Sequence, residues 1–163
     1  MELNINNNLK NKWNFWYHSL NDNNWSLDSY YLICTIEKVE DLIYISKKIN
    51  NMNNGLFFLM KYGISPIYED CQNIDGGYWS FRINKKSSYD MWMELIYFMC
   101  IEEFNNEEFY NNVNGISISP KVNNSIIKIW NKCFTINDKD DIKKYITSVS
   151  NEEIFYLKHE IKS

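Results

Sequence analysis

Two aromatic side chains of this sequence lie in stretches typical of loops, where they could stack on a planar ligand. Trp25 lies between LNDNN and SLDS, and Tyr68 precedes the adjacent acids Glu69 and Asp70. A large aromatic side chain usually packs in the core, but one that a loop presents is often a stacking platform. We therefore treat Trp25 and Tyr68 as candidate ligand-binding residues, with burial in the core as the alternative.

The acids beside Tyr68 lie in a segment whose composition is typical of a long loop. Residues 63–77 (GISPIYEDCQNIDGG) hold one of the two prolines and three of the five glycines. Adjacent acids elsewhere in the chain are explained as solvated residues or as complements to a helix dipole. Glu69 and Asp70 differ because they stand in a loop next to an aromatic ring, so they are candidate ligand-binding carboxylates.

A third candidate group lies near the end of the chain, in the segment SIIKIWN. Strand alternation places Lys128 and Trp130 on one face and Ile127 and Ile129 on the other. The apolar pair is expected to face the core, so Lys128 and Trp130 face outward or into a cavity. The same parity gives the preceding segment, GISISPK, a polar face that consists of Ser117, Ser119 and Lys121.

Aromatic rings, a carboxylate and lysines together suit a positively charged planar ring that carries phosphates. Two aromatic faces can sandwich such a ring, and a carboxylate can accept two N–H donors from a guanine-type edge. Lysines can hold phosphates as point charges. A methylated guanine nucleotide is such a ligand. The sequence contains no GxxxxGK[ST], GxGxxG, HExxH or GxSxG motif that would indicate another chemistry.

Hydrophobic periodicity predicts the elements that position these residues. Strands are expected at residues 12–19, 30–37, 56–62, 78–83, 115–121, 125–131 and 154–161, and helices at 39–50, 88–104 and 140–146. Short connections join two of the strand pairs, which favours an antiparallel sheet, and the three helices must then cover one face of it. The fold class is α+β, and the opposite face is curved or partly solvated and available for a ligand.

Length and composition limit the organisation and the partners. With 163 residues, 45% hydrophobic and 23% charged, residues 12–163 are expected to form a single domain, and the Asn-rich residues 1–11 a flexible tail. The net charge of −4 argues against a protein that coats duplex DNA. We find no apolar run long enough for a membrane span and no signal peptide. The lack of alanine and the many Asn and Lys residues indicate an AT-rich genome, as in a parasite or a large DNA virus.

Cysteine and histidine usage argues against a metal site. The four cysteines form no CxxC pair, and the chain has only two histidines. We interpret the cysteines as reduced thiols of a cytosolic protein, and expect no metal and no cofactor.

Several segments carry a resemblance to one family. They are KWNFW, Trp25, VEDL, LFFLMKYGISPIYED, GGYW, DMWMEL and GISISPK followed by KIW, in order between Lys12 and Ile146. The chain resembles the translation initiation factor 4E family, whose members bind the 7-methylguanosine cap of messenger RNA. The resemblance implies a curved antiparallel sheet, backed on its convex face by three α-helices, with the cap slot on the concave face.

The resemblance also implies roles for the candidate residues around the base. Trp25 resembles the first stacking tryptophan, and Tyr68 stands where most members have the second. Glu69 resembles the glutamate that reads the N1 and N2 edge of guanine. Trp130 resembles the tryptophan that packs on the N7 methyl group.

The phosphate positions depart further from the family. Lys121 stands in for an arginine at the triphosphate, and Tyr78 replaces another basic residue. The second phosphate lysine of the family aligns with Ile126, which cannot bind a phosphate. Lys128 lies two residues further on the same face, and we expect it to take that place; this last step is our inference and no part of the family pattern.

Family members also bind a short helix of the scaffold factor 4G, or of repressors that mimic it, on their helical side. The anchoring tryptophan of that contact is here Ile43, whereas Val39, Met93 and Glu94 match in type. These four are the expected partner-binding residues, with ordinary helix surface as the alternative for Ile43.

The leading hypothesis is a cytoplasmic, monomeric, non-enzymatic protein that binds capped messenger RNA and recruits it to translation through a scaffold partner. One alternative is a repressor or decoy that holds caps without recruiting ribosomes. Another is an enzyme that hydrolyses capped nucleotides with Glu69 or Asp70. The last is a degenerate interaction domain that has lost cap binding.

Overall fold

The protein is built on one curved seven-stranded sheet in which every neighbouring pair of strands is antiparallel. The computed structural model describes residues 8–49, 52–101, 106–149 and 153–161. The strands follow the order β2-β1-β3-β5-β6-β4-β7 across the sheet. Their bounds are β1 Asn8–Ser19, β2 Tyr30–Lys38, β3 Gly55–Lys61, β4 Gly77–Asn84, β5 Val113–Pro120, β6 Asn124–Asn131 and β7 Phe155–Lys158. These findings confirm the predicted antiparallel sheet and its seven strands, except that the last strand is shorter than predicted, because residues 154 and 159–161 lie outside β7.

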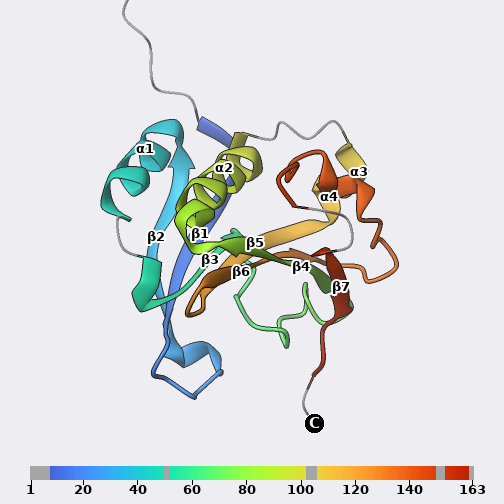
Figure 1. The fold of residues 1–163 in the computed structure, drawn as a ribbon, viewed down its shortest axis with the longest axis horizontal. Coiled ribbons are helices and arrows are strands. Elements are labelled where there is room, and N and C mark those ends of the chain that lie inside the picture. Colours follow the sequence, from blue (N-terminus) through green and yellow to red (C-terminus); the bar gives the residue numbers. More distant parts are fainter. Residues whose placement is uncertain (1–7, 50–51, 102–105, 150–152, 162–163) are drawn as a thin grey trace, which may run out of the picture.

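The helices gather on one face of this sheet. They are α1 Val39–Lys48, α2 Ser88–Ile101, α3 Glu107–Asn112 and α4 Asp140–Lys143. Figure 1 shows α1 and α2 side by side above the sheet, with the shorter α3 and α4 beyond them. The α+β class with helices on one face is therefore confirmed, and α1, α2 and α4 are the three predicted helices. Residues 50 and 102–104, which the predictions included in helices, lie outside the described residues.

Helix α3 was not predicted, because its six residues are too few to show a helical period. The side chain of Asn106 caps its first turn by accepting a hydrogen bond from the backbone N–H of Phe109, at 3.1 Å. Phe109 and Tyr110 are buried. Capping and burial together stabilise a helix whose sequence pattern alone is too short to indicate one.

The predicted flexible tail is wrong for residues 8–11, which belong to β1. Asn8 pairs with Lys38 of β2, and the Asn11 amide donates to the Tyr110 hydroxyl at 3.3 Å. Polar residues can extend a strand here because the ladder to β2 satisfies their backbone groups. The rest of the predicted tail, residues 1–7, lies outside the described residues.

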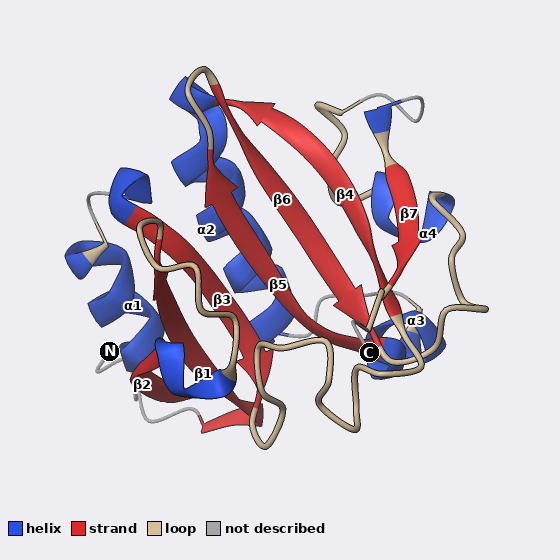
Figure 2. Cartoon of the chain, turned by 90° about the horizontal axis from the view of Figure 1, so that it is seen from below, coloured by secondary structure: helices blue, strands red, loops and turns tan. Residues whose placement is uncertain are grey.

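The two faces of the sheet carry different side chains, as strand alternation predicts. In β1, Trp13 and Phe15 belong to the large core under the helices, whereas Trp16 packs in a smaller cluster on the other face. In β6, Ile127 belongs to the large core and Trp130 to the smaller cluster. Seen from below in Figure 2, the strands cross in front of the helices, and loops border this second face.

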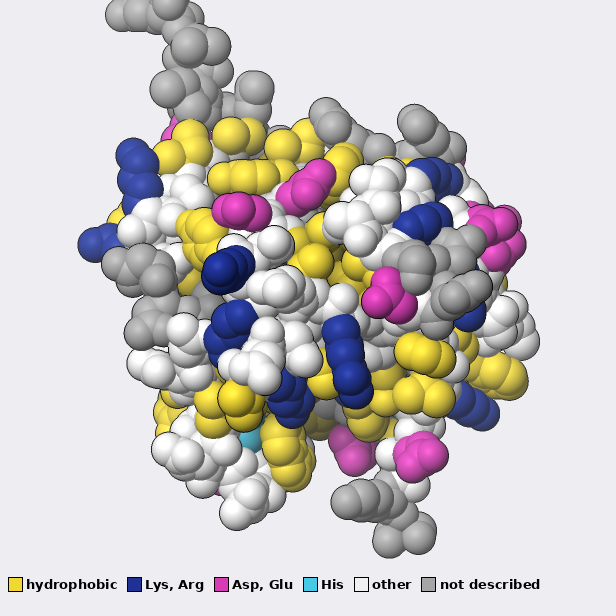
Figure 3. Space-filling model, in the orientation of Figure 1, with side chains coloured by type: hydrophobic (Ala, Val, Ile, Leu, Met, Phe, Trp, Pro, Cys, Tyr) yellow, Lys and Arg dark blue, Asp and Glu magenta, His cyan; other side chains and the backbone are white. Residues whose placement is uncertain are grey.

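The second face is the side of the sheet on which two long connections lie. Figure 3 views the molecule from the side, as Figure 1 does, and shows several Lys and Arg side chains near the centre of this view with hydrophobic side chains below them. In the same orientation, Figure 1 shows the long β1–β2 and β3–β4 connections hanging below the sheet. These two connections carry Trp25 and Tyr68.

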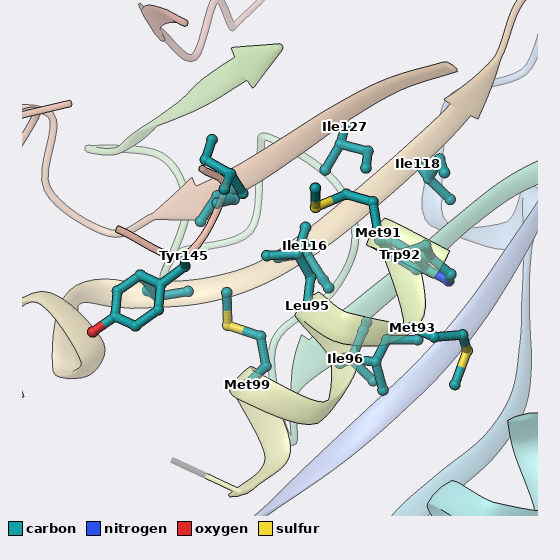
Figure 4. Packing of buried hydrophobic residues seen from close by; sticks show 14 of the residues in the cluster. Met91, Trp92, Met93, Leu95, Ile96, Met99, Ile116, Ile118, Ile127 and Tyr145 are labelled. Atoms are coloured by element: carbon teal, nitrogen blue, oxygen red, sulfur yellow. The ribbon is translucent and has the colours of Figure 1, made fainter. Parts of the chain in front are cut away.

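The large core fixes the sheet on its helices. Figure 4 shows side chains of α2 pointing toward Ile116 and Ile118 of β5 and Ile127 of β6. The most completely buried large side chains include Trp13, Trp79 and Trp92, each with no exposed area. Burial of a large apolar side chain contributes on the order of 2 kcal/mol, so this layer holds the sheet in one shape. Because the sheet has one shape, the residues on its opposite face also have fixed positions.

Candidate ligand-binding site

A cavity of about 470 Å³ opens on the face of the sheet that the helices leave free. Residues of the β1–β2 loop, the β3–β4 loop, β3, β5, β6 and the segment after β7 line it. All six residues predicted to bind a base or its phosphates are among them: Trp25, Tyr68, Glu69, Lys121, Lys128 and Trp130. Ile126 lines it as well. The fold thus brings together candidates that lie up to about a hundred residues apart in the chain.

Trp25 is held at the rim of the cavity by His18. The two rings stack with centroids 4.4 Å apart and planes 6° apart, while 55% of Trp25 stays exposed. Nε2 of His18 lies 2.8 Å from the carbonyl oxygen of Asn24, and the Ser29 hydroxyl donates to the same oxygen at 2.8 Å. Trp25 lines the cavity and His18 does not, so the imidazole backs the indole from outside.

The two acids of the β3–β4 loop have separate tasks. The carboxylate of Asp70 accepts hydrogen bonds from the backbone N–H groups of Ser65 and Gln72, at 2.8 and 2.9 Å. The Asn73 amide donates to the carbonyl oxygens at positions 65 and 67, at 3.0 and 2.8 Å. Asp70 therefore shapes the loop, whereas Glu69 is exposed and lines the cavity. A single carboxylate of this pair is available to a ligand.

Tyr68 lies against three other rings. Its centroid is 4.3 Å from that of His159, 5.0 Å from that of Trp130 and 5.9 Å from that of Tyr78. The planes of Tyr68 and His159 are 28° apart, which is a stacked arrangement. Burial, with Tyr78 nearby, raises the pKa of the Tyr68 phenol well above its usual range. The hydroxyl therefore stays protonated.

The two candidate phosphate-binding lysines differ in their surroundings. Lys121 follows β5 and is exposed. Lys128 is half-buried, its Nζ donates to the Tyr68 hydroxyl at 2.9 Å, and the same atom lies 4.0 Å from the centre of the Tyr78 ring. Burial, with a smaller effect of Lys121, lowers the pKa of Lys128 to about 8. Its ammonium is thus engaged with aromatic side chains.

Trp130 forms part of the floor. It is 3% exposed, and its Nε1–H donates to the Ser117 hydroxyl at 2.9 Å. The Phe58 ring meets it edge to face, with centroids 6.1 Å apart. A buried indole N–H with a partner has one stable orientation, so Trp130 presents the same edge to any ligand.

Sequence reasoning missed two residues at this site, His159 and Glu160. Glu160 lines the cavity, and His159 is 4% exposed beside Tyr68 and Trp130. The backbone N–H of His159 donates to the carbonyl oxygen of Gly76 at 3.1 Å, and this bond leads the chain past the end of β7 into the site. Burial, with a contribution from Lys128, lowers the pKa of His159 to about 4. The pairing of β7 with β4 decides this placement, and no local pattern signals it.

The expected partner-binding residues divide between two helices. Val39 and Ile43 belong to α1, and Ile43 is 43% exposed. Met93 and Glu94 line a shallow groove of about 380 Å³ along α2, where Ile101 is 47% exposed. The groove therefore contains two of the four, and its lining is formed by α2 alone.

Two further findings concern the part of the chain that the structure describes. None of its clusters of His, Cys, Asp or Glu has three members placed to hold a metal ion. Within the same ranges, every helix is too short or too polar to cross a membrane.

The chain is similar in sequence to known translation factors. Residues 8–162 match the model of the family described as eukaryotic initiation factor 4E. The eukaryotic translation initiation factor 4E of Candida albicans is 28% identical over 177 residues, covering 98% of this chain and 82% of that protein. The factor 4E homolog of Acanthamoeba polyphaga mimivirus is 30% identical over 104 residues, which cover 53% of this chain and 38% of the viral protein.

The fold is similar to that of solved structures. The eIF4E-3 protein of C. elegans, in complex with the 4E-binding protein Mextli, matches with a TM-score of 0.80 at 22% identity, covering 94% of each chain. The eIF4E-3 protein of Ascaris suum, in complex with the m2,2,7G cap, matches with a TM-score of 0.78 at 22% identity, covering 97% of this chain and 94% of that one. At this level of identity the likeness establishes the fold.

Proposed function

The chain belongs to the eukaryotic initiation factor 4E family, and on that premise we propose that it binds the 7-methylguanosine cap of messenger RNA. In this role the cavity on the concave face takes the methylated base, and a scaffold partner on the helical side brings the message to the translation machinery. The protein acts in the cytoplasm as a monomer and catalyses no reaction.

The observation that carries the proposal is the convergence of the required chemistry on one cavity. Trp25 and Tyr68 come from two different loops and supply aromatic faces for a cationic ring. Glu69 supplies an exposed carboxylate for the N–H donors of guanine. The volume of about 470 Å³ is in the range of small-ligand pockets, roughly 300 to 1,000 Å³.

The remaining residues of the cavity complete this assignment. Trp130 has one fixed orientation and takes the N7 methyl group of the base. Lys121 is exposed at the end of β5 and takes the phosphates that leave the cavity. Lys128, expected from the sequence to be the second phosphate ligand, contacts the hydroxyl of Tyr68.

A fluorescence titration tests cap binding. We expect 7-methyl-GTP to quench the tryptophan emission and GTP to quench it far less. The base of GTP is neutral, so it lacks the cation–π attraction of the methylated base to two aromatic rings. Trp25→Ala should weaken binding by roughly 1–3 kcal/mol, the usual contribution of a stacked base. Glu69→Gln should weaken it to a similar extent.

Ile43→Ala on the helical side provides the matched control, because it removes an apolar side chain that the cavity does not contain. Its affinity for 7-methyl-GTP should equal that of the wild type. Equal quenching by GTP and 7-methyl-GTP would contradict cap recognition. No quenching by either would favour an interaction domain without cap binding.

A further inference from the structure

Lys128 connects two tyrosines that come from different parts of the chain. It extends from β6 on the face that carries Trp130, and its Nζ donates to the Tyr68 hydroxyl at 2.9 Å. The same Nζ lies 4.0 Å from the centre of the Tyr78 ring of β4, which is within the range of a cation–π contact. One ammonium group therefore engages the β3–β4 loop through Tyr68 and the sheet through Tyr78.

This environment differs from that of a phosphate ligand. A lysine that binds phosphate presents a solvated ammonium, as the exposed Lys121 does. Lys128 is half-buried, and one of its three N–H donors is already used by the Tyr68 hydroxyl. Its lowered pKa, near 8, reflects the same loss of water. The structure thus gives Lys128 a partner inside the protein, in line with a structural task at the site.

The identity of residue 68 makes this contact possible. A tyrosine hydroxyl accepts a hydrogen bond from an ammonium group, whereas the indole N–H of a tryptophan can only donate. A tryptophan at position 68 could not accept the bond from Lys128. Lys128 and Tyr68 therefore form a chemically matched pair.

We propose that Lys128 is a positioning residue for the Tyr68 ring: by holding its hydroxyl, Lys128 fixes the outer end of the ring that stacks on the cap base. The inference rests on the proposed cap-binding function and refines how that site works. The stacked contact of Tyr68 with His159 and the contact with Trp130 limit how far the ring can tilt, and the bond to Lys128 fixes its outer end. A fixed ring needs no ordering when the ligand arrives, which favours binding.

Two probes separate positioning from phosphate binding. The probes are 7-methylguanosine, which carries no phosphate, and 7-methyl-GTP. We expect Lys128→Met to weaken binding of both by the same factor, roughly tenfold, equivalent to about 1.4 kcal/mol. Lys121→Met is the matched control, and it should weaken binding of 7-methyl-GTP while leaving the nucleoside unaffected. A loss confined to 7-methyl-GTP in Lys128→Met would overturn the inference, as would unchanged or tighter binding.

A double-mutant cycle tests whether the effect passes through the hydroxyl. Tyr68→Phe keeps the ring and removes the acceptor, so it should reproduce the loss seen in Lys128→Met. The double variant should bind no more weakly than either single variant. Additive losses would show that Lys128 acts on the ligand by another route and would overturn the inference. Tyr68→Phe retains Lys128 and the aromatic rings at positions 68 and 78, so it still tests the inference if Lys128→Met fails to fold.

A measurement on the free protein keeps the inference distinguishable from the function on which it rests. NMR titration of the Lys128 ammonium should give a lower pKa in Tyr68→Phe than in the wild type. In the wild type the hydrogen bond to the Tyr68 hydroxyl stabilises the charged form of Lys128, and the variant lacks this bond. An unchanged pKa would overturn the Lys128–Tyr68 pair. Failure of the wild-type protein to bind either probe would instead overturn the cap-binding proposal, whatever the titration shows.

Discussion

His18 and Trp25 stack with ring centroids 4.4 Å apart and planes only 6° apart. His159 stacks on Tyr68 with centroids 4.3 Å apart. The chain contains two histidines, and each one backs a ring that we propose to sandwich the cap base. Neither imidazole lines the cavity, so both act from behind the rings that do.

The first prediction concerns the support that His18 gives to Trp25. His18→Ala removes the stacked ring and the group that contacts the Asn24 carbonyl. We expect the affinity for 7-methyl-GTP to fall about tenfold, because an aromatic pair contributes on the order of 1 kcal/mol and the loop would have to be ordered on binding. Fluorescence titration measures the change. His18→Phe keeps the ring and should retain most of the affinity; equal losses in both variants would show that stacking is not the cause.

The second prediction separates the adjacent acids Glu69 and Asp70. Asp70→Ala leaves the N–H groups of Ser65 and Gln72 without their acceptor, so we expect the free energy of unfolding to fall by about 2 kcal/mol. Glu69→Gln should leave stability unchanged and weaken cap binding. Urea denaturation and nucleotide titration of both variants check this contrast. Equal stability of the two variants would contradict the assignment of Asp70 to the loop.

The third prediction concerns the stability of the protein in acid. His159 has its pKa lowered from 6.5 to about 4, so the unfolded chain takes up a proton that the folded protein does not as the pH falls between these values. The contribution of His159 to stability is therefore complete above pH 6.5 and is lost progressively toward pH 4, and it amounts to on the order of 3 kcal/mol. The groups that face the imidazole are the Lys128 ammonium, which opposes its protonation, and the phenols of Tyr68 and Tyr78.

Urea denaturation at several pH values measures this effect against a matched variant. His159→Phe keeps an aromatic ring that does not titrate, so its free energy of unfolding should decline less than that of the wild type between pH 6.5 and 4. Parallel declines in the two proteins would assign the acid sensitivity to carboxylates elsewhere in the chain.

The fourth prediction concerns the helical side. A helical peptide from a scaffold of the factor 4G type should bind across α1 and the α2 groove, and Ile43→Asp should weaken that binding about tenfold by placing a charge against the apolar face of the peptide. Calorimetry with and without 7-methyl-GTP measures it, and Val122→Ser, at a 90% exposed site outside the groove, is the control. A protein that binds caps but no such peptide would be better explained as a repressor or decoy.

Local sequence patterns were sufficient to predict most of the fold. The alternation in residues 125–131 assigned Lys128 and Trp130 to one face and Ile127 to the other, as the two side-chain clusters confirm. Side chains of a strand alternate between its two faces, so the spacing of apolar residues in the sequence indicates which side chains are buried. The polar surroundings of Trp25 also indicated a ring on a loop, and 55% of it is exposed.

Contacts between distant segments could not be predicted in the same way. His159 lies behind Tyr68, and Glu160 reaches the cavity, because β7 pairs with β4. Lys128 likewise meets Tyr68 across 60 positions of the chain. The different roles of Glu69 and Asp70 depend on which of the two adjacent carboxylates accepts hydrogen bonds from the N–H groups of the loop. The extension of β1 to Asn8 depends in the same way on a partner strand.

The sequence by itself determined which residues could do chemistry and which face of each strand they occupy, because both follow from residue type and from the two-residue period of a strand. The tertiary structure alone decided which of them meet and in what state. It made Lys128 a partner of Tyr68, placed a histidine behind each candidate stacking ring and removed Asp70 from the ligand site. The physical reason is that burial, hydrogen-bond partners and pKa values depend on distances between atoms that the order of residues does not specify.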